Sequence, residues 1–310
     1  MPSPEYNARD SHPSLEGKVI LVTGGSSGLG EQCVLAFAQR RPAMIWLAAR
    51  NLSNIQATIT KTREDVPDAA IRPLQIDLNS FDSIKRAASV VLSDSDRLDL
   101  LILNAGAMGL PPGVSQEGYE VHFGANCLGH ALLTKLLIPR LNETAERREV
   151  GDRKPDVRVI LVGSDAVYRS PNNTIHFDRL KSDCKEMGTI GRYGQAKLAT
   201  ALFGRALARQ SPLLKVAVVH PGVGATNLAR SMVEAYPIIR PLVYLSSFLI
   251  QSPESGVRNH LWAALSPEIV SGEYYTPVGQ IGHVTSEVRN DDLADKLWYW
   301  MEGEFPQHGF

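Results

Sequence analysis

The chain has 310 residues, of which 44% are hydrophobic and 21% are charged. This balance is typical of a globular protein with a sizeable core, and it excludes a disordered chain, a collagen and a disulfide scaffold. Thirty-two basic residues against 33 acidic ones give a net charge of -1. We therefore expect no broad positive surface for nucleic acid or an anionic membrane, and look for recognition at a local site.

The cysteines and the N-terminal residues bear on the cellular compartment. Cys33, Cys127 and Cys184 are odd in number and widely separated, which favours a reducing interior over a disulfide framework or a paired metal motif. Residues 1–15 are rich in Pro, Ser and charge and lack an apolar core, so they are predicted to be a flexible tail and not a signal peptide. A cytoplasmic location is expected. The sequence leaves the oligomeric state open between a monomer and a homodimer.

One apolar run, Ile238–Ile250, could be a buried helix or a membrane-associated one. It is shorter than the roughly 18 residues of a membrane-spanning helix, and it contains Arg240 and Pro241. We therefore predict a buried or substrate-covering helix and no firm membrane anchor, with contact at a membrane surface as the alternative.

Apolar runs alternate with amphipathic stretches along most of the chain. Runs this dense in Val, Ile and Leu suit strands buried on both faces of a parallel sheet, with crossover helices between them. Strands are predicted at Lys18–Val22, Met44–Ala49, Ile71–Ile76, Leu98–Leu103, Val157–Val162 and Lys215–Val219. Helices are predicted at Gly28–Arg40, Leu52–Glu64, Phe81–Leu92, around Gly118–Leu141 and at Gly191–Arg209, with a charged loop at Glu143–Asp156. The pattern predicts an α/β protein with a doubly wound parallel sheet (Rossmann fold) and a single domain over residues 16–310.

The first predicted strand leads into a glycine-rich turn, Thr23-Gly24-Gly25-Ser26-Ser27-Gly28-Leu29-Gly30. Glycines allow the turn and the close approach of a pyrophosphate, while the N–H groups at a helix start attract negative charge. The turn therefore predicts a dinucleotide phosphate site. An ordinary tight turn is the alternative.

Arg50 and Asp77 follow the second and third predicted strands. Arg50 lies 20 residues beyond Gly30, where dinucleotide-binding folds place the group that faces the adenosine ribose. A cation at this point, with no carboxylate, favours NADP over NAD, although a solvated Arg at a helix start has the same appearance. Asp77 is a candidate partner of the adenine amino group or a helix N-cap.

Two further motifs extend this pattern into a family resemblance. The fourth strand ends in Leu103-Asn104-Ala105-Gly106, and a later helix contains Tyr193-Gly194-Gln195-Ala196-Lys197. With the turn at residues 23–30, these motifs resemble the short-chain dehydrogenase/reductase superfamily over roughly Lys18–Gly222. The resemblance implies an NADPH/NADP+ site made by Thr23, Gly24, Ser26, Ser27, Gly28, Leu29, Gly30, Arg50, Asp77, Leu78, Asn104, Ala105, Gly106, Tyr193, Lys197, Pro221, Gly222, Val223 and Thr226.

The branch within the superfamily is indicated by other segments. Asn126-Cys127-Leu128-Gly129-His130 is similar to the retinol-dehydrogenase-like and WW-domain-oxidoreductase-like branch. The segments Gly272–Gly279 and Leu293–Trp300 are more similar to its single-domain fungal members. The resemblance thus implies an oxidoreductase, and its fungal members suggest a role in secondary metabolism.

Tyr193 and Lys197 are four residues apart in a predicted helix, so their side chains project from one face. Hydride transfer to a carbonyl creates an alkoxide that needs a proton, and a phenol could supply it. An ammonium nearby should lower the phenol pKa from its usual value near 10. By resemblance, Lys197 also holds the nicotinamide ribose. A Tyr–Lys pair on a solvated helix face is the alternative.

Two more residues complete the catalytic set by resemblance. Ser164 would hydrogen-bond the substrate carbonyl, and Asn126 would support a water leading to Lys197. Their alternatives are a strand-end serine in a turn and a buried amide that braces the backbone. The chain departs from many relatives in two ways: it has Gly163-Ser164 in place of Ser-Ser, and the interval from Ser164 to Tyr193 is long, at 29 residues. Ser164 is nevertheless preferred over Ser170 as the catalytic serine.

Other reactive residue types do not form a recognisable site. His220 has no acidic partner or second ligand at metal spacing, so no metal is expected. Cys127 lacks the signature of a nucleophile and is expected to be a small buried residue.

The segment at about residues 227–252 is apolar and lies where relatives place the cover of the substrate pocket. It predicts a hydrophobic aldehyde, ketone or alcohol as small-molecule substrate, with fungal specialised metabolites, retinoids and steroids all open. The leading hypothesis is an NADP(H)-dependent carbonyl reductase or alcohol dehydrogenase. The alternatives are a non-catalytic nucleotide-sensing interaction protein of the same fold and a methyltransferase that binds adenosylmethionine.

Overall fold

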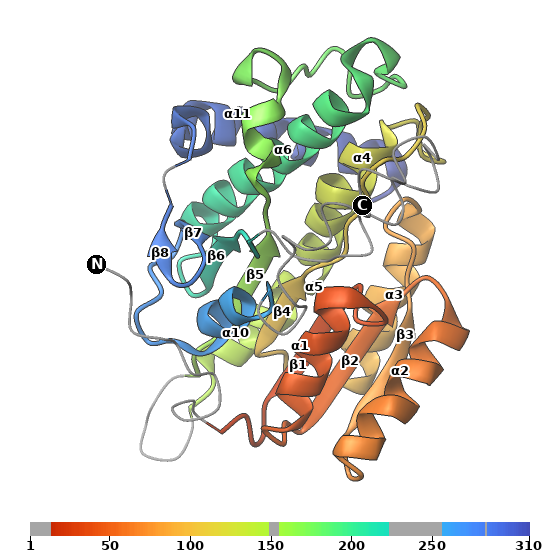
Figure 1. Ribbon diagram of the computed structural model, residues 1–310, viewed down its shortest axis with the longest axis vertical. Helices are drawn as coiled ribbons and strands as arrows, with labels where there is room; N and C mark the ends of the chain where they lie inside the picture. Colours follow the sequence, from red (N-terminus) through yellow and green to blue (C-terminus); the bar gives the residue numbers. More distant parts are fainter. Residues whose placement is uncertain (1–13, 149–154, 223–255, 283) are drawn as a thin grey trace, which may run out of the picture.

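The sheet has the predicted doubly wound architecture. The computed structural model describes residues 14–148, 155–222, 256–282 and 284–310. Its sheet has eight strands in the order β3-β2-β1-β4-β5-β6-β7-β8 (Figure 1). The strands are β1 (Val19–Thr23), β2 (Met44–Ala49), β3 (Ile71–Gln75), β4 (Leu100–Leu103), β5 (Arg158–Val162), β6 (Lys215–Val219), β7 (Tyr274–Thr276) and β8 (Gln280–Ile281). Only the β7–β8 pair is antiparallel among the described pairs, and these two short strands are additional to the six predicted ones.

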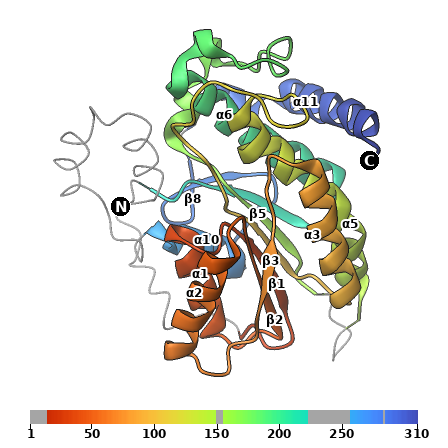
Figure 2. The ribbon, with the colours of Figure 1, turned by 90° about the vertical axis from the view of Figure 1, so that its right-hand side faces the viewer.

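Helices cover both faces of the sheet (Figure 2). One face carries α1 (Gly28–Ala38), α2 (Leu52–Asp65) and α10 (Arg258–Leu265); the other carries α3 (Phe81–Asp94), α5 (Gly129–Glu146), α6 (Gly188–Gln210) and α11 (Asp291–Glu304). Strand side chains alternate between the two cores: Val19 and Leu21 of β1 join the α5 and α6 side, while Ile20 and Val22 join the α1 side. Because both faces are apolar, the central strands appear in the sequence as nearly unbroken apolar runs, whereas the edge strand β3 has exposed Arg72, Pro73 and Gln75.

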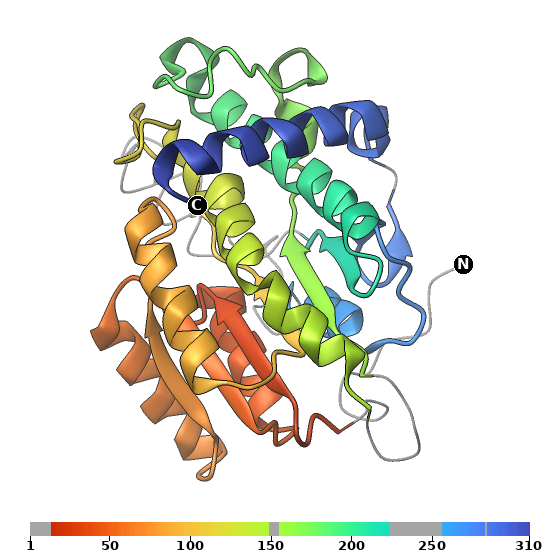
Figure 3. The ribbon, with the colours of Figure 1, turned by 180° about the vertical axis from the view of Figure 1, so that it is seen from behind.

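Shorter helical segments complete the fold. The helix expected around Gly118–Leu141 consists of α4 (Val121–Phe123), a π-helical turn η1 (Gly124–Leu128) and α5, which continues to Glu146 and shortens the predicted charged loop. The 3-10 segments are η2 (Asp165–Arg169), η3 (Pro171–Asn173), η4 (Lys185–Met187), η7 (Ser286–Arg289) and η8 (Phe305–His308). Figure 3 shows α11 crossing the outer side of α6 and ending near α3 and α5. No helix in these described ranges is long and apolar enough to cross a membrane.

The strand order fixes where a ligand can bind. From β1 the chain moves outward through β2 and β3, then returns to the other side of β1 at β4 and continues to β6. In such sheets, ligands bind beyond the carboxyl ends of the strands at this reversal point. The predicted motifs at residues 23–30 and 103–106 end β1 and β4, so they meet there.

Candidate active site

A cavity of about 560 Å³ lies at the carboxyl edge of the sheet and brings most predicted site residues together. It is lined by these predicted residues: Gly24, Ser26, Ser27, Gly28, Leu29, Gly30, Arg50, Asp77, Leu78, Asn104, Ala105, Gly106, Ser164, Tyr193, Lys197, Pro221 and Gly222. Thr23 and Asn126 do not line it but are buried next to residues that do. Val223, Thr226, the segment 227–252 with its apolar run, and the first 13 residues of the predicted tail lie outside the described residues.

The glycine-rich turn packs closely against the end of β4. Gly24 has a left-handed backbone with φ of +67°, and a Cβ there would lie 2.9 Å from Ala105 Cα. Thr23 joins the two strands, since its carbonyl accepts from Asn104 Nδ2 at 2.9 Å and its Oγ1 accepts from the Ala105 amide at 3.0 Å. The turn and β4 therefore hold each other in position.

His130 supports this junction from α5. Its Nδ1 lies 3.2 Å from the Asn126 carbonyl oxygen, which can only accept, so Nδ1 carries the hydrogen. Its Nε2 is then the acceptor for the Thr23 hydroxyl at 2.9 Å. Burial lowers the pKa of His130 to about 3, which keeps the ring neutral and this arrangement fixed.

The turn also has the shape of a dinucleotide cradle. Ser27 precedes α1 without capping it through its side chain, which leaves the N–H groups of the first helical turn for a ligand. A Cβ at Gly30 would lie 2.2 Å from the Gly24 carbonyl oxygen, and one at Gly106 would lie 3.0 Å from Asn126 Oδ1. Side chains at these positions would therefore not fit. The glycines present let the protein backbone come close to a bound phosphate, so the residues fit a phosphate-bearing cofactor.

We expect Gly30→Ala to abolish cofactor binding and to destabilise the fold, because the new methyl group would overlap the Gly24 carbonyl oxygen. Gly303→Ala in α11 is the matched control, because a Cβ there meets nothing within 4 Å. This substitution should stabilise the helix by about 0.5–1 kcal/mol. Thermal melting and fluorescence titration with NADPH measure both effects. Normal NADPH binding by Gly30→Ala would contradict the cradle.

The second half of the cavity holds Ser164, Tyr193 and Lys197. Lys197 and Tyr193 lie on the same side of α6, with the Lys197 Nζ 5.8 Å from the centroid of the Tyr193 ring. The same Nζ donates to the Val162 carbonyl oxygen at 2.8 Å, which ties it to the end of β5. Ser164 is separated from the end of β5 only by Gly163. Its hydroxyl accepts from the Ala166 amide at 3.1 Å and donates to Asp165 Oδ1 at 3.2 Å, as in the turn considered as its alternative role, and it lies close enough to Tyr193 to favour the phenolate of that residue.

Tyr274 explains why this chain has glycine before Ser164. A Cβ at Gly163 would lie 2.7 Å from the Tyr274 hydroxyl oxygen. That hydroxyl donates to the Ser164 carbonyl oxygen at 3.0 Å. The ring of Tyr274, from β7, thus occupies the place of a side chain at position 163 and fixes the backbone of Ser164.

The pKa values of the Tyr–Lys pair differ from the sequence-based expectation. Burial raises the pKa of Tyr193 to about 12, and the nearby Ser164 hydroxyl offsets only part of this rise. Burial also lowers the pKa of Lys197 to about 8. The predicted lowering of the Tyr193 pKa by the ammonium was wrong for this structure: burial of the phenol and the nearby Asp165 carboxylate raise the pKa, and only Ser164 lowers it.

Asn126 lies in the π-helical turn η1 and is fully buried. Its Oδ1 accepts from the Ala107 amide at 2.8 Å, and its Nδ2 donates to the Ala107 carbonyl oxygen at 2.9 Å. Its own carbonyl oxygen accepts from the Thr200 hydroxyl at 3.1 Å. The side chain therefore braces the backbone after β4, and the water-mediated link to Lys197 stays a prediction.

Comparisons with known proteins agree with this geometry. The family model for short chain dehydrogenases matches residues 18–168. An uncharacterized oxidoreductase of Schizosaccharomyces pombe is 35% identical over 98% of this chain and 89% of its own length. Retinol dehydrogenase 13 of Homo sapiens is 31% identical over 93% of this chain and 84% of its own length.

The chain belongs to the short-chain dehydrogenase/reductase family. The expected resemblance to its retinol-dehydrogenase-like branch is confirmed, and the methyltransferase alternative is excluded. A crystal structure of a protein from Mycobacterium paratuberculosis superposes on this short-chain dehydrogenase with a TM-score of 0.74 at 25% identity, covering 96% of this chain and 97% of that one.

The sequence analysis missed several residues that line the cavity of this short-chain dehydrogenase. Among them are Asn51, Asn54, Asn79, Met108, Leu110, Asp165 and His220, the last of which was considered only as a metal ligand. Asp165 could have been found as the neighbour of Ser164. Met108 and Leu110 carry no local signal, because only the tertiary path of the loop brings them to Tyr193.

The metal-ligating residue types and Cys127 of this oxidoreductase lie as follows among the described residues. No group of three or more His, Cys, Asp or Glu side chains there is placed to hold a metal ion. Cys127 is fully buried, and burial raises the pKa of its thiol far above the usual range. Its thiolate is therefore strongly disfavoured.

Proposed function

We propose that this oxidoreductase is NADP(H)-dependent and interconverts a hydrophobic aldehyde or ketone and its alcohol, with Tyr193 as the acid/base. The observation that carries the proposal is that one cavity runs from the glycine-rich turn and Arg50 to Ser164, Tyr193 and Lys197. A phosphate-binding end and a proton-donating end therefore share one continuous space. When bound, the cofactor supplies the hydride chemistry.

The chain's own residues would divide the remaining work. With its pKa raised to about 12, Tyr193 is protonated at neutral pH and can donate to the oxygen of a carbonyl substrate. Ser164 lines the same cavity as Tyr193, and its hydroxyl would turn from Asp165 Oδ1 to donate to the same oxygen. Lys197, with a pKa of about 8, is mostly an ammonium at pH 7 and favours negative charge that develops beside it.

The test is NADPH oxidation with a panel of lipophilic aldehydes and ketones. The proposal expects turnover by the wild type and loss of turnover in Tyr193→Phe. The alternative is a protein that binds the cofactor but acts through a partner surface. Tight NADPH binding with no turnover by either protein would favour that alternative.

Arg50 should decide the choice between NADPH and NADH. It is exposed at the end of β2, lines the cavity, and has no acidic partner among the residues that the structure describes. A charge-assisted hydrogen bond contributes about 1.5–3 kcal/mol, so Arg50→Ala should weaken NADPH binding by about 10- to 100-fold. NADH, which has no 2′-phosphate, should lose much less.

Arg72→Ala is the matched control for this prediction. Arg72 is an exposed arginine of β3, paired with Asp94 at 3.1 Å, and it does not line the cavity. Its removal should change neither dissociation constant. Equal losses for NADPH and NADH in Arg50→Ala would count against the NADP assignment.

The substrate side supports a hydrophobic substrate. A second cavity of about 550 Å³ adjoins Ser164 and Tyr193, and its lining includes Met108, Tyr168 and Ile190. Asp165, Arg169 and Thr189 line the same cavity. The Met108 and Ile190 side chains and the Tyr168 ring give it an apolar part that suits an aliphatic or aromatic carbonyl compound. The cytoplasmic location stays a prediction, and both a monomer and a homodimer are compatible with the sequence.

A further inference from the structure

The loop between β4 and α4 forms part of the cavity wall beside Tyr193. Met108 and Leu110 of this loop line the main cavity, and Met108 also lines the second one. Residues 104–113 have no regular secondary structure. The position of this wall therefore depends on the groups that bind its backbone.

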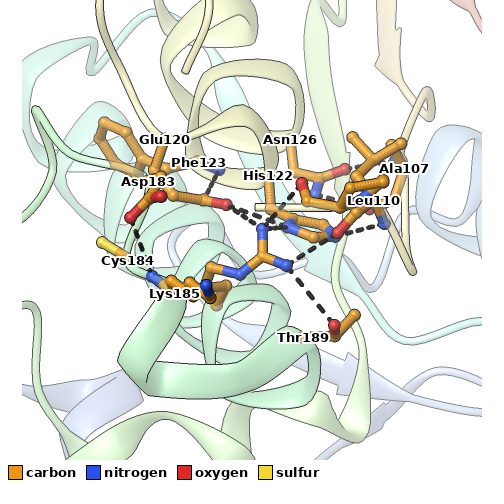
Figure 4. Close-up of polar contacts among 12 residues, drawn as sticks. Ala107, Leu110, Glu120, His122, Phe123, Asn126, Asp183, Cys184, Lys185 and Thr189 are labelled. Carbon is orange, nitrogen blue, oxygen red and sulfur yellow. Dashed lines mark hydrogen bonds and ion pairs between the residues drawn. The ribbon is translucent and has the colours of Figure 1, made fainter. Parts of the chain in front are cut away.

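Side chains hold the loop backbone at Ala107 and Leu110, as Figure 4 shows, and Arg192 Nη1 also donates to the Pro111 carbonyl oxygen at 3.4 Å. Asn126 binds both polar backbone groups of Ala107. One helical turn earlier, His122 Nε2 accepts from the Leu110 amide at 3.2 Å. From α6, Arg192 Nη2 donates to the Leu110 carbonyl oxygen at 2.8 Å. Both backbone groups of Leu110 are thus bound by side chains.

Arg192, Glu120 and His122 form a fully buried cluster. Arg192 Nη1 donates to Glu120 Oε1 at 2.9 Å. Because His122 Nε2 accepts from an amide, the hydrogen of the neutral ring is on Nδ1, which donates to the same carboxylate oxygen at 3.1 Å. Arg192 Nη1 lies 3.2 Å from this Nδ1, and since both nitrogens then carry hydrogen, they share Glu120 Oε1 as their acceptor. Burial raises the pKa of Glu120, but the hydrogen bonds from His122 and from the Phe123 amide lower it by more than burial raises it. The pKa of Glu120 is therefore below its ordinary value, and the carboxylate is ionised.

A role in positioning accounts for this cluster better than a role in stability. A buried ion pair rarely stabilises a fold more than apolar residues of the same size, because both charges lose their hydration. This pair instead holds His122 and Arg192 in the orientation that binds Leu110. Arg192 immediately precedes Tyr193, and the His122 ring contacts the Tyr193 ring edge-on with centroids 6.1 Å apart. The cluster therefore connects the loop directly to the catalytic helix.

We propose that Arg192, Glu120 and His122 are positioning residues that fix Met108 and Leu110 relative to Tyr193 and so set the KM for substrates long enough to reach this loop. The proposal rests on the carbonyl-reductase function proposed above. A short carbonyl compound at Ser164 and Tyr193 would not need the loop. A long one would lie along it.

The experiment compares His122→Leu with His122→Gln, using decanal and propanal as the long and short substrates. Both variants lose the ring and keep the Arg192–Glu120 pair, but only Gln retains an acceptor for the Leu110 amide and a donor for Glu120. In His122→Leu, the KM for decanal should rise about tenfold more than that for propanal, which corresponds to about 1.4 kcal/mol. His122→Gln should restore most of this ratio. Equal changes for both aldehydes, or no rescue by Gln, would overturn the proposed effect on substrates.

Hydrogen exchange of the backbone tests the positioning independently of turnover. The Leu110 amide should exchange about tenfold faster in His122→Leu than in wild type or His122→Gln, while the Ala107 amide, bound by Asn126, should not change. Unchanged exchange at Leu110 would overturn the role of His122. If wild-type protein reduces neither aldehyde, the carbonyl-reductase function fails along with the effect on KM, and the exchange data still decide whether the cluster holds the loop.

Discussion

Tyr193→Phe should lower the rate of NADPH-dependent carbonyl reduction by about 10²- to 10⁴-fold, the range expected when a general acid is removed. The substitution deletes one oxygen atom and keeps the ring, which is 5% exposed and packs against His122. The geometry of the cavity should therefore be preserved. NADPH binding, measured by fluorescence titration, should change by less than about twofold, a difference of under about 0.5 kcal/mol.

Tyr275→Phe is the matched control for this prediction. Tyr275 is 1% exposed, and its hydroxyl accepts from the Val270 amide at 2.7 Å, away from the cavity lining. The hydroxyl also donates to the Val270 carbonyl oxygen at 3.3 Å. This variant should therefore lose about 1–2 kcal/mol of stability through the two missing hydrogen bonds and keep its reductase rate. A rate loss of similar size in both variants would show that the effect of Tyr193→Phe is structural, and full activity of Tyr193→Phe would refute its role as the acid.

The strands that build the site could be predicted because burial on both faces leaves a strong local signal. The strands β1 and β5 each have five residues, four of them apolar, and each is followed at once by the turn that carries the site residues. The strands β7 and β8 have only three and two residues, and they were not predicted. Tyr274, the residue that makes Gly163 necessary, lies on β7 and was therefore missed as a contact of Ser164.

Tertiary packing limited the prediction of the site's electrostatics. The four-residue spacing of Tyr193 and Lys197 correctly placed both on the cavity. It could not show that both side chains are 5% exposed or less, which decides the direction of the Tyr193 pKa. The Arg192–Glu120 pair joins residues 72 positions apart, so no local pattern in the sequence indicates it.

Lys197→Met should abolish most of the reductase activity and yet stabilise the cofactor-free protein at pH 7. The side chain of Lys197 is 4% exposed, and burial lowers its pKa from 10.5 to about 8. A shift of this size corresponds to a cost on the order of 3 kcal/mol for keeping the ammonium buried. Loss of the hydrogen bond to the Val162 carbonyl oxygen offsets about 1 kcal/mol of the gain. Chemical denaturation should therefore show a net increase of about 2 kcal/mol in the free energy of unfolding.

The pH dependence separates this effect from a general change in packing. Because the pKa of Lys197 is lower in the folded chain than in the unfolded one, the unfolded chain binds more protons between about pH 8 and 10.5. This group therefore makes wild-type stability rise with pH across that window, whereas Lys197→Met lacks the rise. The advantage of the variant should be full below pH 8, and by about pH 10.5 it should have reversed to a deficit of about 1 kcal/mol, the contribution of the lost hydrogen bond to Val162. Lys135→Met, which removes a half-exposed lysine paired with Glu302 at 2.6 Å, should show no such advantage at any pH. A difference between Lys197→Met and wild type that is constant with pH would mean that the buried ammonium carries no energetic cost.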